Sequence, residues 1–289
     1  MTQERGTDRT ITTRRISFEE SLADLPRHFA GEGDLVSSHV IAGLSSVFPD
    51  GEDFFVRSVR HFRDHITDPV LKRQVAGFIG QESVHGREHR VLNDKLAELG
   101  YPTKQVERVT KAGLALRWRL LPAKSNLAVT AALEHFTATM AELVMTDEEI
   151  RVALGHDAVR NLFLWHALEE SEHKAVAFDV YRAVGGTERL RIWTMKIVRT
   201  GFLLGSLVEL AVSLAMDGDT FKPGVLRRSL AKVRGTRLVS RQLWNQLREY
   251  DRPGFHPDDH DTTALVEFWK AELFGEQGVL KGQLAGSAA

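Results

Sequence analysis

FIGQESVHGREH, residues 78–89, sets a glutamate and a histidine three residues apart within a helical pattern of apolar side chains. A second stretch, LWHALEESEHKAVAFDVY at residues 164–181, repeats this arrangement. The two pairs are Glu82 with His85 and Glu170 with His173. Residues three apart share one face of a helix, so each pair could hold a metal ion together. One such match alone is a weak signal, so the surrounding pattern has to support it.

Both pairs lie within the apolar stripe of their predicted helix. The stripe of the first also contains Leu71, Val75, Phe78, Leu92 and Leu96, with His89 in the same row. The stripe of the second also contains Val159, Leu162, His166, Ala177, Val180 and Val184. A carboxylate in a core-facing row is costly unless it is paired or bound to a metal. The pattern therefore predicts buried ionisable groups with a chemical role.

Two further glutamates stand level with these pairs if the helices form antiparallel hairpins. Glu52 and Glu82 each lie 15 residues from a turn near residue 67 (67 − 52 and 82 − 67). Glu134 and Glu170 each lie 18 residues from a turn near residue 152 (152 − 134 and 170 − 152). At a rise of about 1.5 Å per residue, the carboxylates of each hairpin reach the same height. We therefore predict four carboxylates and two imidazoles around one site, with Glu142 as the alternative to Glu134.

Apolar residues recur at intervals of three and four along the chain, which predicts an all-α fold. The expected helices cover 34–47, 51–66, 69–99, 104–120, 125–147, 157–184, 188–216, 222–249 and 261–282. Two tight hairpins with a longer crossover between them are one way to build a ferritin-like four-helix bundle, here with additional N- and C-terminal helices. We expect a disordered leader at 1–15, the bundle at 16–185 and a C-terminal helical extension packed on it at 186–289.

The composition excludes several kinds of site. The 289 residues contain no cysteine, which rules out disulfides, iron–sulfur clusters, thiolate zinc sites and a cysteine nucleophile. The formal net charge is −1, so no basic excess points to a nucleic-acid partner. Residues 1–15 lack an apolar signal region, and we expect a cytoplasmic protein.

The apolar segment 197–216 is the one stretch that suggests a membrane. It contains Arg199 and Glu209, and its uninterrupted apolar runs are short for a span. We expect a buried helix, a homodimer contact or a shallow membrane contact. The basic residues of 222–249 are expected to face water, with anionic lipid as the alternative partner.

Five motifs resemble those of the bacterial proteins called predicted metal-dependent hydrolases, a ferritin-like group. They are FPDGEDFFVRSVRHF (48–62), FIGQESVHGREH (78–89), ALEHFTA (132–138), LWHALEESEHKAVAFDVY (164–181) and RPGFHPDD (252–259). The resemblance runs from about residue 15 to residue 270 and implies a di-metal carboxylate bundle. The hydrolase activity in the family's name is itself a prediction. His256, in the last motif, has no assigned mechanism, and a tight turn explains it equally well.

His166 adds a seventh candidate ligand through a second resemblance. It gives the order His-x-x-x-Glu-x-x-His, which is similar to that of di-iron arylamine N-oxygenases, where a histidine at this spacing ligates one iron. A core or supporting role is the alternative for His166, and His89 is a further residue that could touch the site. Glu88, Glu169 and Glu172 are expected either to be solvated or to orient the histidines.

The predicted ligand set is therefore Glu52, Glu82, His85, Glu134, His166, Glu170 and His173, holding two metal ions. Mixed nitrogen and oxygen ligands favour iron, with manganese or zinc as alternatives. The first hypothesis is an O₂-dependent oxidase or oxygenase of a small apolar or aromatic substrate. Its pocket would be lined by Phe55, Phe78, Phe136, Phe163 and Trp165. The alternatives are a dinuclear hydrolase, in which two metals activate water, and a non-catalytic iron-binding or ferroxidase protein.

Overall fold

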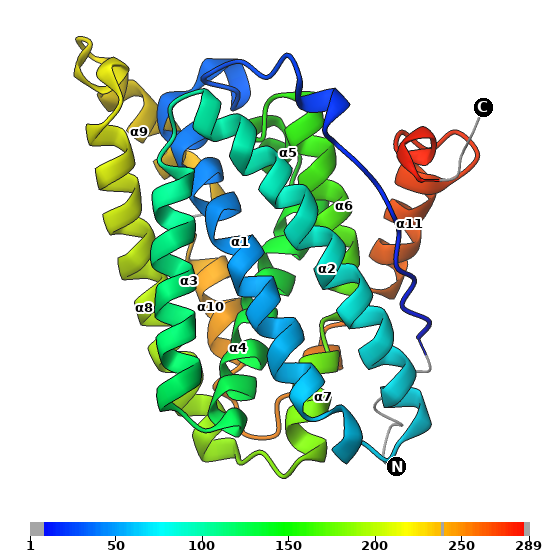
Figure 1. Ribbon diagram of the computed structural model, residues 1–289. Coiled ribbons are helices and arrows are strands. Elements are labelled where there is room, and N and C mark those ends of the chain that lie inside the picture. Colours follow the sequence, from blue (N-terminus) through cyan, green and yellow to red (C-terminus); the bar gives the residue numbers. More distant parts are fainter. Residues whose placement is uncertain (1–8, 238–239, 286–289) are drawn as a thin grey trace.

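The structure is a computed structural model that describes residues 9–237 and 240–285 (Figure 1). Within these ranges the regular elements are helices, and the only strand-like feature is an isolated antiparallel bridge between Ile16 and Leu284. The predicted all-α fold class is thus confirmed. The α-helices are α1 (Leu35–His61), α2 (Pro69–Glu98), α3 (Thr103–Leu120), α4 (Ala123–Thr146), α5 (Glu148–Ala153), α6 (Asp157–His173), α7 (Val176–Ala183), α8 (Glu188–Ala215), α9 (Val225–Gly235), α10 (Arg241–Glu249) and α11 (Thr263–Phe274).

Four long helices form the centre of the molecule. α1 packs along α2, α4 packs along α6, and the two pairs meet through α1 with α4 and α2 with α6. The other helices cover this centre: α3 lies against α1 and α2, α8 against α1 and α4, α9 against α1, α10 against α4, and α11 against α6 (Figure 1). The helices of the two predicted hairpins therefore surround a common interior. A ferritin-like relationship stays a prediction.

The first long helix differs from its prediction. The ranges 34–47 and 51–66 were expected as separate helices, but α1 runs unbroken from Leu35 to His61 with Pro49 inside it. A proline has no N–H to donate to the carbonyl four residues before it. Here the Ser45 carbonyl instead accepts a hydrogen bond from the Asn93 side-chain amide of α2, at 3.1 Å. This outside donor satisfies the carbonyl that Pro49 leaves free and lets the helix continue.

The expected helix 157–184 is interrupted. α6 ends at His173 and α7 begins at Val176. Lys174 lies at the break, is only 5% exposed, and donates from Nζ to the His260 carbonyl and the Thr262 hydroxyl. These bonds supply the partners that a buried ammonium needs.

The expected C-terminal helices are also shorter in the structure. The range 222–249 divides into α9 and α10, with residues 238–239 outside the described part. The range 261–282 contains only α11, which ends at Phe274 before Gly275. The C-terminal extension nevertheless packs on the central helices through α8, α10 and α11.

Residues 9–15 differ from the disordered leader that was expected at 1–15, of which residues 1–8 lie outside the described part. Residues 9–18, here called the N-terminal strap, run in non-helical conformation beside α2 and α6 (Figure 1). Close approach requires glycine on α2: a Cβ at Gly77 would lie 2.6 Å from the Ile11 carbonyl, and one at Gly80 would collide with Thr13. The strap also binds α2 through the Phe18 N–H, which donates to Glu88 at 2.8 Å.

Two apolar cores fill the interior, one on either side of the ionisable residues. On α2, Phe78 belongs to one core and Leu92 to the other, while Glu82, His85 and His89 lie between them. The five aromatic residues expected to line a substrate pocket are at most 8% exposed and divide between the cores: Phe55, Phe78 and Phe136 in one, Phe163 and Trp165 in the other. These side chains therefore lie on opposite sides of the layer of ionisable residues. All five were expected from the sequence to line one substrate pocket.

Candidate metal centre

All seven predicted ligands meet in the interior between the four central helices. Glu52 comes from α1, Glu82 and His85 from α2, Glu134 from α4, and His166, Glu170 and His173 from α6. Every one of them is 4% exposed or less. Glu142, the alternative to Glu134, is only half-buried and joins neither of the clusters described below. The glutamates that the hairpin register placed at one height along the bundle therefore do lie close together in the structure. Their role as metal ligands stays a prediction.

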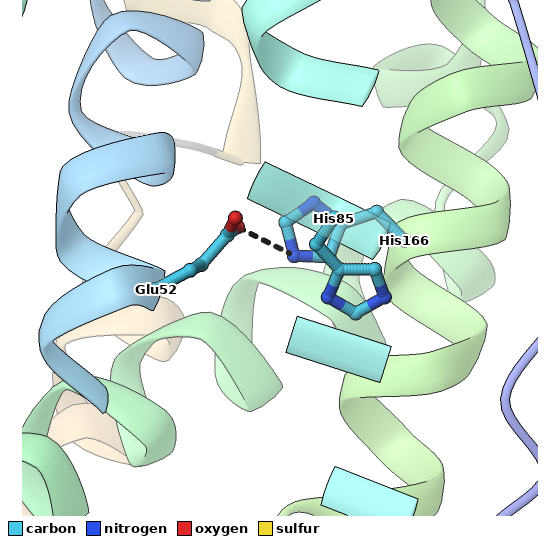
Figure 2. Close-up of side chains that lie close together, drawn as sticks. All are labelled: Glu52, His85 and His166. Atoms are coloured by element: carbon cyan, nitrogen blue, oxygen red, sulfur yellow. Dashed lines mark ion pairs between the residues drawn. The ribbon is translucent and has the colours of Figure 1, made fainter. Parts of the chain in front are cut away.

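The donors form two groups within this layer. The first is Glu52, His85 and His166, and the second is Glu82, Glu170 and His173. Within each group the potential ligand atoms lie within 4.8 Å of one another, a separation that a single ion can bridge. Figure 2 shows the first group, with Glu52 of α1 pointing across the interior toward the two imidazoles.

Glu170 links the two groups. Its Oε1 lies 3.0 Å from His166 Nε2, 3.4 Å from His173 Nε2 and 3.6 Å from His85 Nδ1. One carboxylate oxygen thus lies close to imidazoles of both groups, so Glu170 is placed to contact ions held by either group. Glu134 completes the second group, with its Oε2 at 3.5 Å from His173 Nε2.

Several acceptor atoms in this layer lack hydrogen-bond partners among the described residues. They are both carboxylate oxygens of Glu52 and Glu134, Oε2 of Glu82 and of Glu170, and Nδ1 of His85, whereas Glu82 Oε1 lies 2.9 Å from His173 Nε2. Buried polar atoms in folded proteins almost always have a partner, because an unpaired one costs free energy. So many unpaired lone pairs facing a common point fit divalent cations, whose preferred ligands are carboxylate oxygens and neutral imidazole nitrogens.

The shifted pKa values of the ionisable residues in this layer also fit a site for divalent cations. Burial, followed by the neighbouring carboxylates, raises the pKa of Glu52 and of Glu134 well above the ordinary glutamate value. Burial would also raise the pKa of Glu170, yet ion pairing with His173 and His166 holds that pKa well below its usual value. In return, Glu170 and Glu82 raise the pKa of His173 against the effect of burial. Without metal, ionisation of Glu52 and Glu134 is therefore disfavoured, and a bound divalent cation would favour it.

The outer nitrogens of two histidines are held by hydrogen bonds that leave the inner nitrogen free. His85 Nε2–H donates to Glu169 Oε2 at 3.0 Å, so the unpaired Nδ1 faces Glu170. His173 Nδ1–H donates to Gln81 Oε1 at 2.8 Å, so Nε2 faces the carboxylates. Ligating histidines commonly donate their second N–H to an oxygen in this way, which sets the tautomer and the ring orientation.

A longer chain of hydrogen bonds orients His166. The Ser45 hydroxyl donates to Asn93 Oδ1 at 2.7 Å, so it accepts from His89 Nδ1–H at 2.9 Å. Burial, followed by the charge of His166, lowers the pKa of His89 well below the usual value, so the ring is neutral and its Nε2 is an acceptor. That Nε2 lies 2.7 Å from His166 Nδ1 and accepts its proton. His166 Nε2 then points toward Glu52 and Glu170, at 3.7 Å and 3.0 Å from their Oε1 atoms. His89 therefore acts as a positioning residue for His166.

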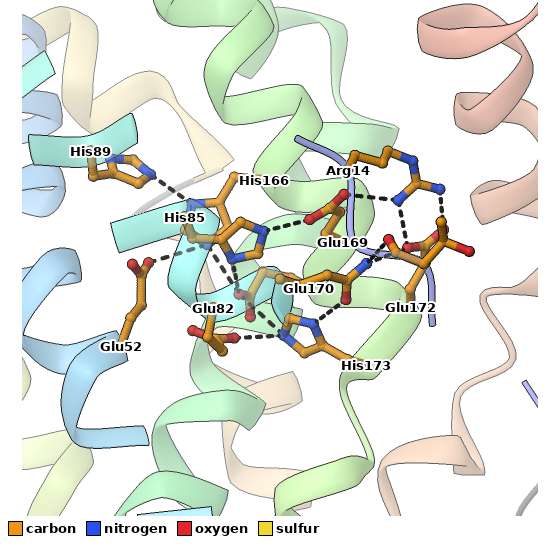
Figure 3. Close-up of polar contacts among 12 residues, drawn as sticks. Arg14, Glu52, Glu82, His85, His89, His166, Glu169, Glu170, Glu172 and His173 are labelled. Carbon is orange, nitrogen blue, oxygen red and sulfur yellow. Dashed lines mark hydrogen bonds and ion pairs between the residues drawn. The ribbon is translucent and has the colours of Figure 1, made fainter. Parts of the chain in front are cut away.

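The N-terminal strap reaches this network through Arg14. Its guanidinium donates to Glu169 Oε1 at 2.9 Å and to both oxygens of Glu172 at 2.8 Å (Figure 3). Glu169 in turn binds His85, and Glu172 accepts from the Gln81 amide at 2.7 Å, while Gln81 binds His173. One arginine thus supports the outer partners of two candidate ligands. Glu169 and Glu172 match the expected orienting role, whereas the sequence did not indicate Arg14 or Gln81.

Replacing Arg14 with alanine is expected to weaken metal binding by about 10- to 100-fold, the usual cost of losing an outer partner of a ligand. The variant leaves Glu169 and Glu172 without their shared cation, so the Glu169–His85 and Gln81–His173 contacts lose their fixed geometry. Competition with a chromophoric chelator measures the change. Arg14→Lys, which keeps the charge but cannot fork to both glutamates, should fall in between. Unchanged affinity in Arg14→Ala would show that the strap does not support the centre.

A second cluster of histidine and aspartate lies outside the bundle interior and was not predicted. His28 Nε2 lies 3.1 Å from Asp219 Oδ2 and 3.7 Å from Asp217 Oδ2. These carboxylates already have cationic partners, with Arg27 at 3.2 Å from Asp217 and Lys222 at 2.7 Å from Asp219. The charges of this cluster are therefore balanced within an ion-pair network, which connects the end of α8 to the N-terminal region.

His256, whose role was left open, has a structural partner in the loop after α10. Its Nε2 lies 2.9 Å from Asp179 Oδ1 of α7, and its Nδ1 accepts from the Asp258 N–H at 3.1 Å. The ring also meets Phe178 edge to face. The motif RPGFHPDD therefore fixes this loop to α7, and His256 lies apart from the seven candidate ligands.

These features define an all-α protein whose interior holds a carboxylate-rich centre suited to divalent metal ions. The chain belongs to the family of predicted metal-dependent hydrolases, whose sequence profile matches residues 12–261. No curated protein and no solved structure gives a match to the chain. The matched range includes all seven candidate ligands, Arg14 of the strap and the loop that contains His256.

Proposed function

We propose that this protein is a dinuclear metal-dependent hydrolase, with its two ions held by the seven residues of the candidate metal centre. The observation that carries the proposal is the set of buried carboxylate oxygens without partners, joined through Glu170 into one site. Membership of the family of predicted metal-dependent hydrolases supports a hydrolytic reaction. Glu52, His85 and His166 would hold one ion, Glu82, Glu134 and His173 the other, and Glu170 would contact both.

Bound divalent ions would supply Lewis acidity, which lowers the pKa of a coordinated water to about 7. The protein itself would orient the ligand side chains toward the ions. With metal bound, the three histidines would present unprotonated nitrogens to the ions, because Glu169, Gln81 and His89 contact their other nitrogens. The apolar cores above and below exclude bulk water and strengthen every electrostatic interaction at the centre.

A small cavity beside His173 provides a route for water. It measures about 10 Å³ and is lined by Arg9 and Ile11 of the strap, together with Gln74, Val176 and Asp258 among others. That volume is on the order of one water molecule. A larger substrate can approach His173 by this route only if the strap moves away from α2 and α6.

This proposal takes the place of the oxygenase hypothesis, which relied on an aromatic pocket beside the metals. The five aromatic side chains belong to two separate cores, and the family supports hydrolysis. One observation still favours redox chemistry as a second candidate: four glutamates with three histidines form a ligand set typical of iron or manganese. Zinc sites generally use fewer ligands.

Activity of protein loaded separately with Mn²⁺, Zn²⁺ or Fe²⁺ tests the proposal. We expect hydrolysis of chromogenic carboxylic or phosphate esters with at least one of these ions, and its loss in Glu170→Ala. The matched comparison is O₂ consumption by the reduced, iron-loaded protein. O₂ uptake together with no hydrolysis of any ester would overturn the hydrolase proposal in favour of the redox candidate.

A further inference from the structure

Exposed apolar side chains gather on one side of the molecule. Of the 17 large hydrophobic side chains that are exposed in the described part, 13 lie within residues 109–121 and 193–221. These two stretches include the outer sides of α3 and α8. Figure 1 shows α3 and α8 on the same side of the molecule, and both helices pack on α1. A concentration of this kind on a folded protein marks an interaction surface.

α8 provides most of this surface. Along its length Trp193, Ile197, Leu204, Val208 and Val212 are between 53% and 67% exposed. By length and composition alone, α8 is also the one described helix that could cross a membrane, and only 17% of its most apolar window is buried.

The charged residues in the apolar part of α8 turn inward. Arg199 is 7% exposed and binds Asp251 at 2.8 Å, and the Glu209 carboxylate lies against Gly43 of α1. The outer side from Ile197 to Met216 therefore carries no charge. α8 therefore lies on the surface of the protein with this uncharged side outward, and the Arg199–Asp251 ion pair holds its inner side.

Positive charge is concentrated on the same face. α3, α8 and α9 together contain 13 lysines and arginines but only 3 aspartates and glutamates, whereas the whole chain contains 38 and 39. The three helices thus have a formal charge of +10, and the rest of the chain has −11. All three pack on α1, so the charge and the exposed apolar side chains lie side by side. Arg108, Lys111, Lys196, Arg227 and Arg228 are among the exposed basic residues.

We propose that the face formed by α3, α8 and α9, here called the basic apolar face, docks on the surface of an anionic lipid bilayer. The outer side of α8 would enter the boundary between headgroups and acyl chains, and the basic residues would contact lipid phosphates. A second copy of this chain fits less well, because the exposed lysines and arginines of two such faces would repel each other. A nucleic acid fits less well because the centre of the face is apolar. The inference is independent of the reaction at the metal centre.

Flotation with lipid vesicles tests this inference on the full chain. We expect binding to vesicles of phosphatidylcholine with phosphatidylglycerol, weakened by high salt, and little binding to phosphatidylcholine alone. Leu204→Glu/Val208→Glu should abolish the binding. Arg227→Glu/Arg228→Glu should reduce it by at least roughly tenfold. Circular dichroism and metal content would show that the variants remain folded.

Val152→Glu/Val279→Glu is the matched control, since these valines are 62% and 63% exposed but lie outside the basic apolar face. It should bind vesicles as the unmodified protein does. Failure to bind anionic vesicles, or full binding by Leu204→Glu/Val208→Glu, would overturn the inference. A dimer that dissociates in Leu204→Glu/Val208→Glu without any vesicle binding would instead identify the face as a contact between copies.

Discussion

Replacing Glu170 with alanine is expected to remove both metal ions at once. Its Oε1 is the atom that lies between the two groups of donors, 3.0 Å from His166 Nε2 and 3.4 Å from His173 Nε2. Loss of a bridging ligand should exceed the about 100-fold loss of affinity that removal of an outer partner causes. The measurement is metal content per chain after dialysis against a weak chelator.

Two glutamates provide the comparison for Glu170→Ala. Glu52→Ala should preferentially weaken the ion held with His85 and His166, leaving an intermediate metal content. Glu142→Ala, at a half-buried position on the same helix as Glu134, should leave the content unchanged. Equal metal content in Glu170→Ala and the unmodified protein would contradict a bridging position for this carboxylate.

The second large effect concerns stability without metal. We expect Glu52→Gln/Glu134→Gln to raise the free energy of unfolding of the metal-free protein at pH 8 by about 3 kcal/mol or more, because burial disfavours the ionisation that both carboxyls gain on unfolding, whereas neutral amides carry no such cost. Both glutamates have a pKa well above the ordinary value, with burial as the main cause. The same substitutions should abolish high-affinity metal binding, so stability and metal binding would change in opposite directions.

The sign of the pH dependence follows from these raised pKa values. Above the ordinary glutamate pKa, Glu52 and Glu134 bind more protons in the folded metal-free protein than in the unfolded chain, so their contribution to stability falls as pH rises. Metal ions reverse this trend, since their ligands must be deprotonated and binding strengthens with pH. Urea unfolding at pH 5 and pH 8, with and without a chelator, measures both slopes. The gain in stability from the two glutamines should be larger at pH 8 than at pH 5 in the metal-free protein. An equal gain at the two pH values, or a loss of stability with the two glutamines, would contradict the account.

Helical periodicity and hairpin register predicted the convergence of six of the seven candidate ligands, and His166 was added through a family resemblance. The spacing of Glu82 and His85 defines one face of α2, and the equal distances from each turn place Glu52 and Glu134 level with the pairs. This reasoning needs only the rise of a helix. It also predicted the all-α class, because the interval of three and four is a property of each segment alone.

The features that the sequence did not reveal depend on contacts between distant segments. Arg14 binds Glu172 across 158 residues, and Gln81 binds His173 across 92. No periodic pattern encodes such pairs. Likewise, Pro49 predicted a helix boundary, and only the amide of Asn93 on another helix explains why α1 continues. The apolar segment of α8 was evident, but its position on the same face as α3 and α9 follows from their common packing on α1.

Metal content of the purified protein tests the central claim most directly. The protein would be prepared without chelators, loaded anaerobically with Fe²⁺, Mn²⁺ or Zn²⁺, and analysed by mass spectrometry beside Glu82→Ala/Glu170→Ala. The account predicts roughly two ions per chain in the unmodified protein, as a dinuclear carboxylate site requires, and none in the double variant. No bound metal after any loading, or the same content in the double variant, would contradict a dinuclear metal centre in this bundle.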